Sequence, residues 1–136
     1  MSLVIDASVV AAWVFADERS TASASILRSV GAHGAVAPAI WPLEGENLLL
    51  TGERQGRMTR GERDAFLVRL AELPVRIEMP AWVGVNEALA LADTHRLTAY
   101  DAAYLELAHR LHLLLASKDD LLVLAAAGLG VEVLTA

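Results

Sequence analysis

The sequence SLVIDASVV occupies residues 2–10 and places one acidic residue between two apolar runs. Leu3–Ile5 is short and apolar with little polar alternation, as is typical of a strand buried on both faces. Apolar residues resume directly after Asp6, which predicts a helix over Ser8–Ala16. The opening of the chain therefore predicts a strand, an acidic turn and a helix in immediate succession.

The same alternation of short strands and longer helices continues to the end of the chain. Further strands are predicted at Ala35–Ala37, Val75–Ile77, Leu113–Ala116 and Val131–Leu134. The remaining helices are predicted at Thr21–Gly31, Pro42–Gln55, Arg60–Leu73, Trp82–His95, Ala99–Leu111 and Asp119–Ala127. Strands that alternate with helices imply right-handed crossovers and a mostly parallel sheet. We expect one α/β domain over residues 1–136, with three α/β/α layers.

Composition excludes several classes of protein. The chain has no cysteine, which excludes a disulfide framework and a thiolate zinc site and suits a reducing cytoplasm. No apolar run approaches the roughly 20 residues of a membrane span, so we expect a cytoplasmic protein. The net charge of −6 argues against binding nucleic acid chiefly through a basic face. Acidic residues can still bind a polyphosphate chain through divalent cations.

Acidic residues recur at comparable places in this pattern, namely Asp6, Glu44, Asp101 and Asp119. Three of them lie just beyond the carboxyl end of a predicted strand, and all four lie near a helix N-terminus. Ligands of an open parallel sheet bind at that edge. Each acid alone is well explained as a helix cap or as a charge that favours the helix dipole. Four carboxylates at one crevice, however, repel one another unless cations or protons are present.

The donor types indicate which metal such a crevice would bind. Carboxylate oxygens without cysteine or a histidine pair favour Mg²⁺ or Mn²⁺ over Zn²⁺. His109 and His112 lie near a helix C-terminus, where they are better explained by contacts with terminal carbonyls. A magnesium site can activate water for attack on a phosphodiester and stabilise the leaving oxygen. The residues thus predict metal-dependent hydrolysis of a nucleic-acid backbone.

Three segments carry these acids: VIDASVVAAWV (4–14), PAIWPLEGENLLL (38–50) and LTAYDAAYLELAHRLHLLLASKDDLLVLAAAGLGVEVL (97–134). In this order they resemble PIN-domain ribonucleases, especially the VapC-like toxins of prokaryotic toxin–antitoxin modules. The resemblance covers nearly the whole chain. It implies an endoribonuclease that uses Mg²⁺ (or Mn²⁺), is often a homodimer, and is neutralised by a small VapB-like antitoxin.

The resemblance also implies roles for single residues. The family's catalytic and metal-binding acids fall on Asp6, Glu44, Asp101 and Asp119. Ser8 matches a hydroxyl two residues after the first acid, and Asn47 matches a polar position after the glutamate, so both are expected to support the site. A further acid that the family sometimes carries is replaced by Val123, so a second metal ion would lack this ligand.

The neighbours Asp119 and Asp120 need to be told apart. If the strand ends at Ala116, Ser117 can cap the next helix, and Asp120 lies three residues on, where a capping-box side chain reaches back. Asp119 is then free to turn toward the site. This register predicts a catalytic Asp119 and a structural Asp120.

Three other groups of residues have both a functional and a simpler explanation. The first group is a cluster of arginines that could contact RNA phosphates: Arg54, Arg57, Arg60 and Arg63. Acidic residues are interleaved with them, which is equally typical of an exposed junction between helices. The tryptophans are expected in the core, although partner interfaces also favour them: Trp13, Trp41 and Trp82. A stripe at helical spacing is expected to pack on the sheet or across a dimer: Tyr100, Ala103, Tyr104, Leu107 and Leu111.

Two alternatives to a ribonuclease remain open at this point. A receiver-type signalling domain also gathers acids at the carboxyl edge of a parallel sheet. It would normally have adjacent acids after its first strand, whereas Ala7 follows Asp6 here. The second alternative is a PIN-like module that binds partners without catalysis. The presence of all four matched acids argues against it.

Overall fold

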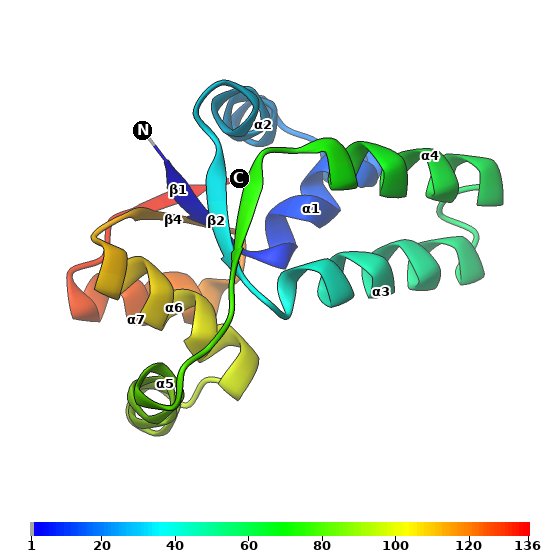
Figure 1. Cartoon of the computed structure of the whole chain (residues 1–136). Helices are drawn as coiled ribbons and strands as arrows, with labels where there is room; N and C mark the ends of the chain where they lie inside the picture. The colour runs from blue at the N-terminus through cyan, green and yellow to red at the C-terminus, as the bar shows by residue number, and fades with distance from the viewer. Residues whose placement is uncertain (1) are drawn as a thin grey trace.

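The computed structural model describes residues 2–136 and contains one five-stranded, fully parallel sheet in the order β3-β2-β1-β4-β5 (Figure 1). The strands are β1 (Leu3–Ile5), β2 (Ala35–Pro38), β3 (Val75–Glu78), β4 (Leu114–Ser117) and β5 (Val133–Thr135). All the predicted strands are confirmed, with ends displaced by a residue or two. A receiver-type domain is excluded, because it places its first strand between the second and third rather than between the second and fourth.

Helices fill every connection between the strands. They are α1 (Ala7–Val14), α2 (Thr21–His33), α3 (Trp41–Arg54), α4 (Arg60–Glu72), α5 (Trp82–His95), α6 (Ala99–Leu111) and α7 (Asp120–Leu129), with a short 3-10 helix η1 (Ala16–Glu18) after α1. Ser20 and Thr59 begin α2 and α4 with complete capping boxes, which satisfy amides that the first helical turn leaves without partners. Local sequence therefore determines where these two helices start.

The helices form the two outer layers of an α/β/α sandwich. β1 leads to β2 and then to β3 in one direction along the sheet, whereas β4 leads to β5 in the other direction. Right-handed crossovers then place α1 to α4 on one face and α5 to α7 on the opposite face. Figure 1 shows this division, and it also shows α3 and α4 as a hairpin that extends beyond the sheet.

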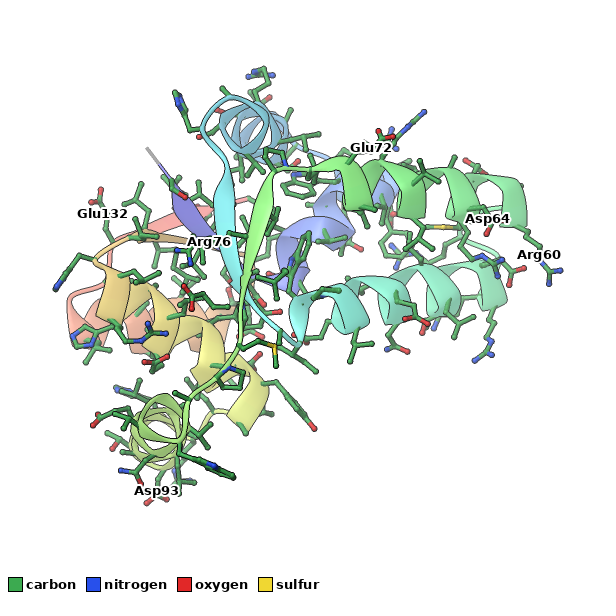
Figure 2. The ribbon with its side chains drawn as sticks, in the orientation of Figure 1. Arg60, Asp64, Glu72, Arg76, Asp93 and Glu132 are labelled. Carbon is green, nitrogen blue, oxygen red and sulfur yellow. The ribbon has the colours of Figure 1, made fainter. Side chains whose placement is uncertain are left out.

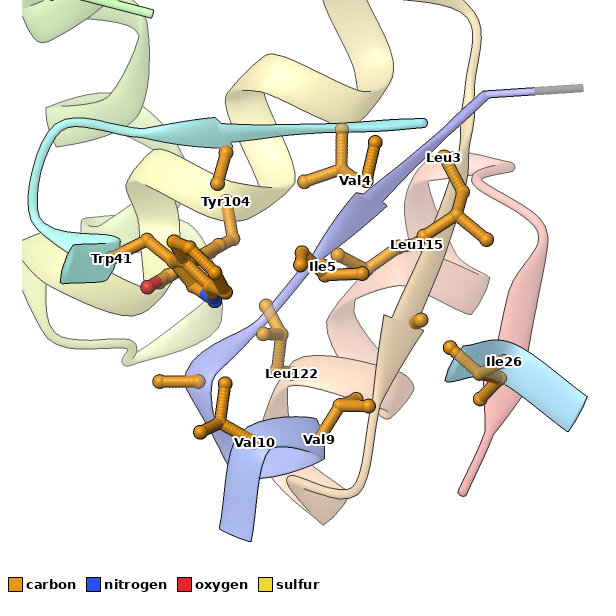
Figure 3. Close-up of a cluster of buried hydrophobic side chains, with 14 of the residues drawn as sticks. Leu3, Val4, Ile5, Val9, Val10, Ile26, Trp41, Tyr104, Leu115 and Leu122 are labelled. Atoms are coloured by element: carbon orange, nitrogen blue, oxygen red, sulfur yellow. The ribbon is translucent and has the colours of Figure 1, made fainter. Parts of the chain in front are cut away.

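The core lies around the central strands. Figure 3 shows Val4 and Ile5 of β1 surrounded by Leu115 of β4, Leu122 of α7 and Tyr104 of α6. All five side chains are fully buried. Burial of β1 on both faces confirms the strand type inferred from its apolar run.

The periphery differs from the prediction. The edge strands β3 and β5 are not buried on both faces, because a neighbouring strand covers only one edge of each and the helix layers are incomplete there. Within the described chain, α4 and α5 contain no buried residue.

Trp13 and Trp41 are in the core as expected, but Trp82, at the start of α5, is 86% exposed. Among residues 2–136, no helix has both the length and the apolar character needed to cross a membrane.

Candidate active site

The candidate site begins where β1 and β4 end side by side. Ile5 pairs with Ala116, and the Asp6 amide donates a hydrogen bond to the Ala116 carbonyl at 3.0 Å. Because the connections from β1 and β4 leave in opposite directions along the sheet, a crevice opens between their carboxyl ends. The register therefore holds Asp6 at the point of the sheet where ligands bind in folds of this kind.

Two serine hydroxyls hold the Asp6 carboxylate in place. Ser8 Oγ and Ser117 Oγ both donate to Oδ2 of Asp6, each at 2.8 Å. Asp6 is the N-cap residue of α1, but its side chain makes no capping hydrogen bond, so the simple capping explanation is wrong for it. Burial raises the pKa of the Asp6 carboxyl above its ordinary value, although the two hydroxyls oppose this shift. Oδ1 is left free of both serines and can accept a ligand.

The register predicted for Asp119 and Asp120 is wrong. β4 continues through Ser117, one residue further than expected, so Asp119 becomes the N-cap of α7 and its Oδ1 accepts from the Leu122 amide at 2.9 Å. Ser117 does not cap the helix; its hydroxyl accepts from the Asp119 amide at 3.0 Å and donates to Asp6. Asp120 is an exposed first-turn residue. Asp119 therefore has one oxygen in the cap and the other available to the site.

Glu44 and Asp101 reach the crevice from the first turns of α3 and α6. Glu44 Oε1 accepts a hydrogen bond from the Tyr104 hydroxyl at 2.6 Å. Thr98 caps α6 by accepting from the Asp101 amide at 3.1 Å, which confirms that part of the expected capping pattern. Both acids are half-buried. The helix fixes the backbone of each, and the carboxylate stays accessible from the crevice.

The charges of the acids act on one another. Burial is the main cause that raises the pKa of Glu44, and the charges of Asp6 and Asp101 add to it. Burial likewise raises the pKa of Asp101, with added repulsion from Asp119 and then Asp6. The fold thus brings the predicted acids from four separate elements into one electrostatically coupled group. Their catalytic roles stay a prediction.

The donor atoms fit a hydrated Mg²⁺ or Mn²⁺ ion. Within residues 2–136, no three histidine, aspartate or glutamate side chains lie close enough to enclose a metal ion by themselves. Mg²⁺ does not require such a cage, because it keeps several waters and takes only one or two protein carboxylates directly. Asp6, through Oδ1, is suited to direct contact. Glu44, Asp101 and Asp119 are suited to direct or water-mediated contact.

The other predicted residues lie outside this group. Asn47 is exposed on α3, and His109 and His112 are exposed at the C-terminal end of α6. Three of the four arginines have acidic partners: Arg57 pairs with Asp17 and Glu18, Arg60 with Glu53, and Arg63 with Asp64. Figure 2 shows Arg60 and Asp64 at the outer end of the α3–α4 hairpin, away from the sheet. An exposed, mixed-charge helix junction is thus the better explanation of the arginines.

Sequence reasoning missed two residues of the site. Ser117 was assigned to a helix cap and Tyr104 to packing, yet their hydroxyls bind Asp6 and Glu44. Ser117 precedes Asp119 by two residues just as Ser8 follows Asp6 by two, and Tyr104 lies three residues after Asp101 on the same helix face. These spacings are weak indications, because hydroxyl residues are common near helix starts.

Known structures share this fold. PAE2754 from Pyrobaculum aerophilum matches with a TM-score of 0.71 and 21% identity over 92% of this chain and 84% of that chain. FitAcB from Neisseria gonorrhoeae matches with a TM-score of 0.67 and 16% identity over 98% of this chain and 96% of that chain. A toxin–antitoxin complex from Klebsiella pneumoniae matches with a TM-score of 0.58 and 13% identity over 93% and 91% of the two chains. At these identities the likeness establishes the fold.

Sequence similarity goes further. The curated protein Ribonuclease VapC3 of Pyrobaculum aerophilum is 33% identical over 113 residues, which are 82% of this chain and 84% of the relative. The family model of the PIN domain matches residues 3–127. The stretch matched by the family model includes all four acids of the crevice. The chain belongs to the PIN-domain family.

Proposed function

We propose that this protein is a magnesium-dependent endoribonuclease, for which Mn²⁺ can substitute, and that it is the toxin of a type II toxin–antitoxin module. The observation that carries the proposal is the group of coupled acids at the β1–β4 switch point, in which two serines orient Asp6. The name of the relative, a VapC ribonuclease, supports RNA as the substrate.

The arrangement of the acids supports the proposed requirement for a cation. Asp6 is buried and Glu44 and Asp101 are half-buried, and their charges repel one another, so the three acids resist ionisation together. An RNA phosphodiester would meet the same repulsion. A bound divalent ion supplies the compensating charge, activates water and stabilises the leaving oxygen. Asp6 holds its Oδ1 in a fixed direction, and Asp119 offers the oxygen that is not engaged in its cap.

Cleavage of RNA by the purified protein tests this function. We expect internal cleavage with Mg²⁺ or Mn²⁺ and none with a chelator, and Asp6→Asn is the control for contaminating nucleases. Metal-independent cleavage contradicts the proposed chemistry. RNA that is bound with metal but stays intact favours the non-catalytic PIN-like module.

We also propose that two copies of the chain associate through an apolar flank. The flank comprises exposed side chains of α4, β3 and α5 and of the turn between β3 and α5: Leu67, Val68, Ile77, Met79, Trp82, Val83 and Leu89. β3 runs along this side of the molecule from α4 to α5 (Figure 1). An exposed apolar surface of this kind, beside an unpaired strand edge, marks an interaction site. A homodimer would cover it.

The antitoxin requires a separate surface. A cleft of about 340 Å³ between α1, α2 and α4 is lined by apolar side chains, including Trp13, Leu27 and Phe66, with Arg19 and Arg69 among its lining residues. These features suit an amphipathic antitoxin segment with apolar anchors and nearby acids. The toxin–antitoxin complex among the similar structures supports a partner of this type. Leu27→Asp should weaken binding of the cognate antitoxin at least about tenfold and leave RNA cleavage unchanged. Unchanged antitoxin binding would exclude this cleft.

A further inference from the structure

Tyr104 forms a direct link between two acids of the site. It is 0% exposed and lies three residues after Asp101 on α6, and its hydroxyl donates to Glu44 Oε1 at 2.6 Å. α6 packs on the sheet, α5 and α7, whereas α3 packs mainly on α1 and α4. The helices that carry Asp101 and Glu44 are therefore placed by different neighbours. The Tyr104 hydroxyl connects them across 60 positions of sequence.

Glu44 needs such a contact more than Asp6 does. Its side chain has one more rotatable bond than an aspartate and is only half-buried, so it can swing toward solvent. The charges of Asp6 and Asp101 favour this outward movement, because both repel Glu44. The Asp6 carboxylate is held by two serine hydroxyls, but the hydroxyl of Tyr104 is the side-chain donor seen on Glu44 in the described chain.

Tyr104 donates this hydrogen bond from a position with no solvent access. Its ring is enclosed by the core, so it does not reach the crevice where RNA would bind.

We propose that Tyr104 is a positioning residue, which fixes Oε1 of Glu44 so that Oε2 faces the divalent-cation site before the cation binds. This inference rests on the proposed metal-dependent function. Donors that hold a ligand carboxylate in place typically contribute 10- to 100-fold, as an order of magnitude, to metal affinity. Removal of the hydroxyl alone should thus weaken cation binding while the aromatic ring still fills the core.

Calorimetric titration with Mn²⁺ alone tests the inference without RNA. The variants are Tyr104→Phe, Glu44→Gln and the double variant, and circular dichroism verifies that each is folded. Tyr100→Phe is the matched control, because Tyr100 is on the same helix but 60% exposed. We expect Tyr104→Phe to bind Mn²⁺ at least about tenfold more weakly than wild type, and Tyr100→Phe to bind it normally.

The double variant separates positioning from a general effect on the fold. If Tyr104 acts through Glu44, adding Tyr104→Phe to Glu44→Gln causes no further loss of Mn²⁺ affinity. Additive losses, or wild-type affinity in Tyr104→Phe, overturn the inference and leave the proposed function standing. Failure of the wild-type protein to bind Mn²⁺ overturns both.

Discussion

The helices α1 and α5 both begin with apolar residues but differ in their surroundings. α1 buries seven of its eight residues between the sheet and its neighbouring helices. α5 packs mainly on α6, and none of its residues is buried within the described chain. α1 starts at the acid group, and α5 belongs to the apolar flank. The difference indicates that a single chain buries the core beside the acid group but leaves the apolar flank exposed.

The largest expected effect is the loss of RNA cleavage when acids of the group beside the buried helix α1 are neutralised. Asp6→Asn and Asp101→Asn should each reduce RNA cleavage by at least about a hundredfold, because a neutral amide cannot replace carboxylate charge at a magnesium site. Circular dichroism should show that both variants are folded. Near-wild-type cleavage by either purified variant would remove that residue from the proposed site.

Next in size is the contrast between the neighbours Asp119 and Asp120. Asp119→Ala should remove most of the activity and also destabilise the protein by about 1 kcal/mol, because the N-cap of α7 is lost. Asp120→Ala should stay active and cost less than about 0.5 kcal/mol through the helix dipole. Cleavage assays and urea unfolding of both variants measure these effects. Loss of activity in Asp120→Ala alone would reverse the assignment.

The apolar flank that includes α5 predicts that a charge placed there will weaken self-association of the chain. Trp82→Asp should weaken self-association at least about tenfold, because a large apolar contact is replaced by a charge in both copies. Light scattering coupled to gel filtration gives the mass over a range of concentrations. Leu124→Asp is the control, since Leu124 is similarly exposed but lies on α7. If the wild-type protein stays monomeric at high concentration, the proposal that a second copy covers the apolar flank is wrong.

The smallest expected effect is a change in melting temperature when Asp101 is neutralised. The raised pKa of Asp101 means that its ionised form is disfavoured in the folded state, a cost that is present at neutral pH and disappears below the ordinary aspartate pKa. In chelator at pH 7, Asp101→Asn should therefore have a higher melting temperature than wild type.

Two conditions should reduce this difference in melting temperature. Acidification protonates wild-type Asp101 and removes the cost of its charge, and Mg²⁺ stabilises the wild-type fold by binding it more tightly than the variant. Differential scanning calorimetry across pH, with and without Mg²⁺, gives the difference. If both proteins respond equally to Mg²⁺, Asp101 does not contribute to the cation site.

The acids of the proposed site could be singled out from sequence because they stand next to strong local patterns. Asp6 follows a wholly apolar strand, and Asp101 follows a threonine cap at the usual spacing. Ser8, two residues after Asp6, could also be expected to support the site, whereas the contacts of Ser117 and Tyr104 could not be predicted, because they join residues 111 and 60 positions apart. Such contacts depend on strand register and on which helices share a face of the sheet.

The local sequence by itself determined the alternation of strands and helices and most of their boundaries, because apolar periodicity and capping residues act over a few positions. Its carboxylates also pointed to the proposed metal-dependent chemistry. Tertiary structure alone decided the roles of Asp119 and Ser117, because one more residue in β4 changed which of them caps α7. It also decided that Trp82 is exposed while Trp13 and Trp41 are buried. Burial depends on the order of the strands and on which helices find a neighbour, and those contacts join residues far apart in the chain.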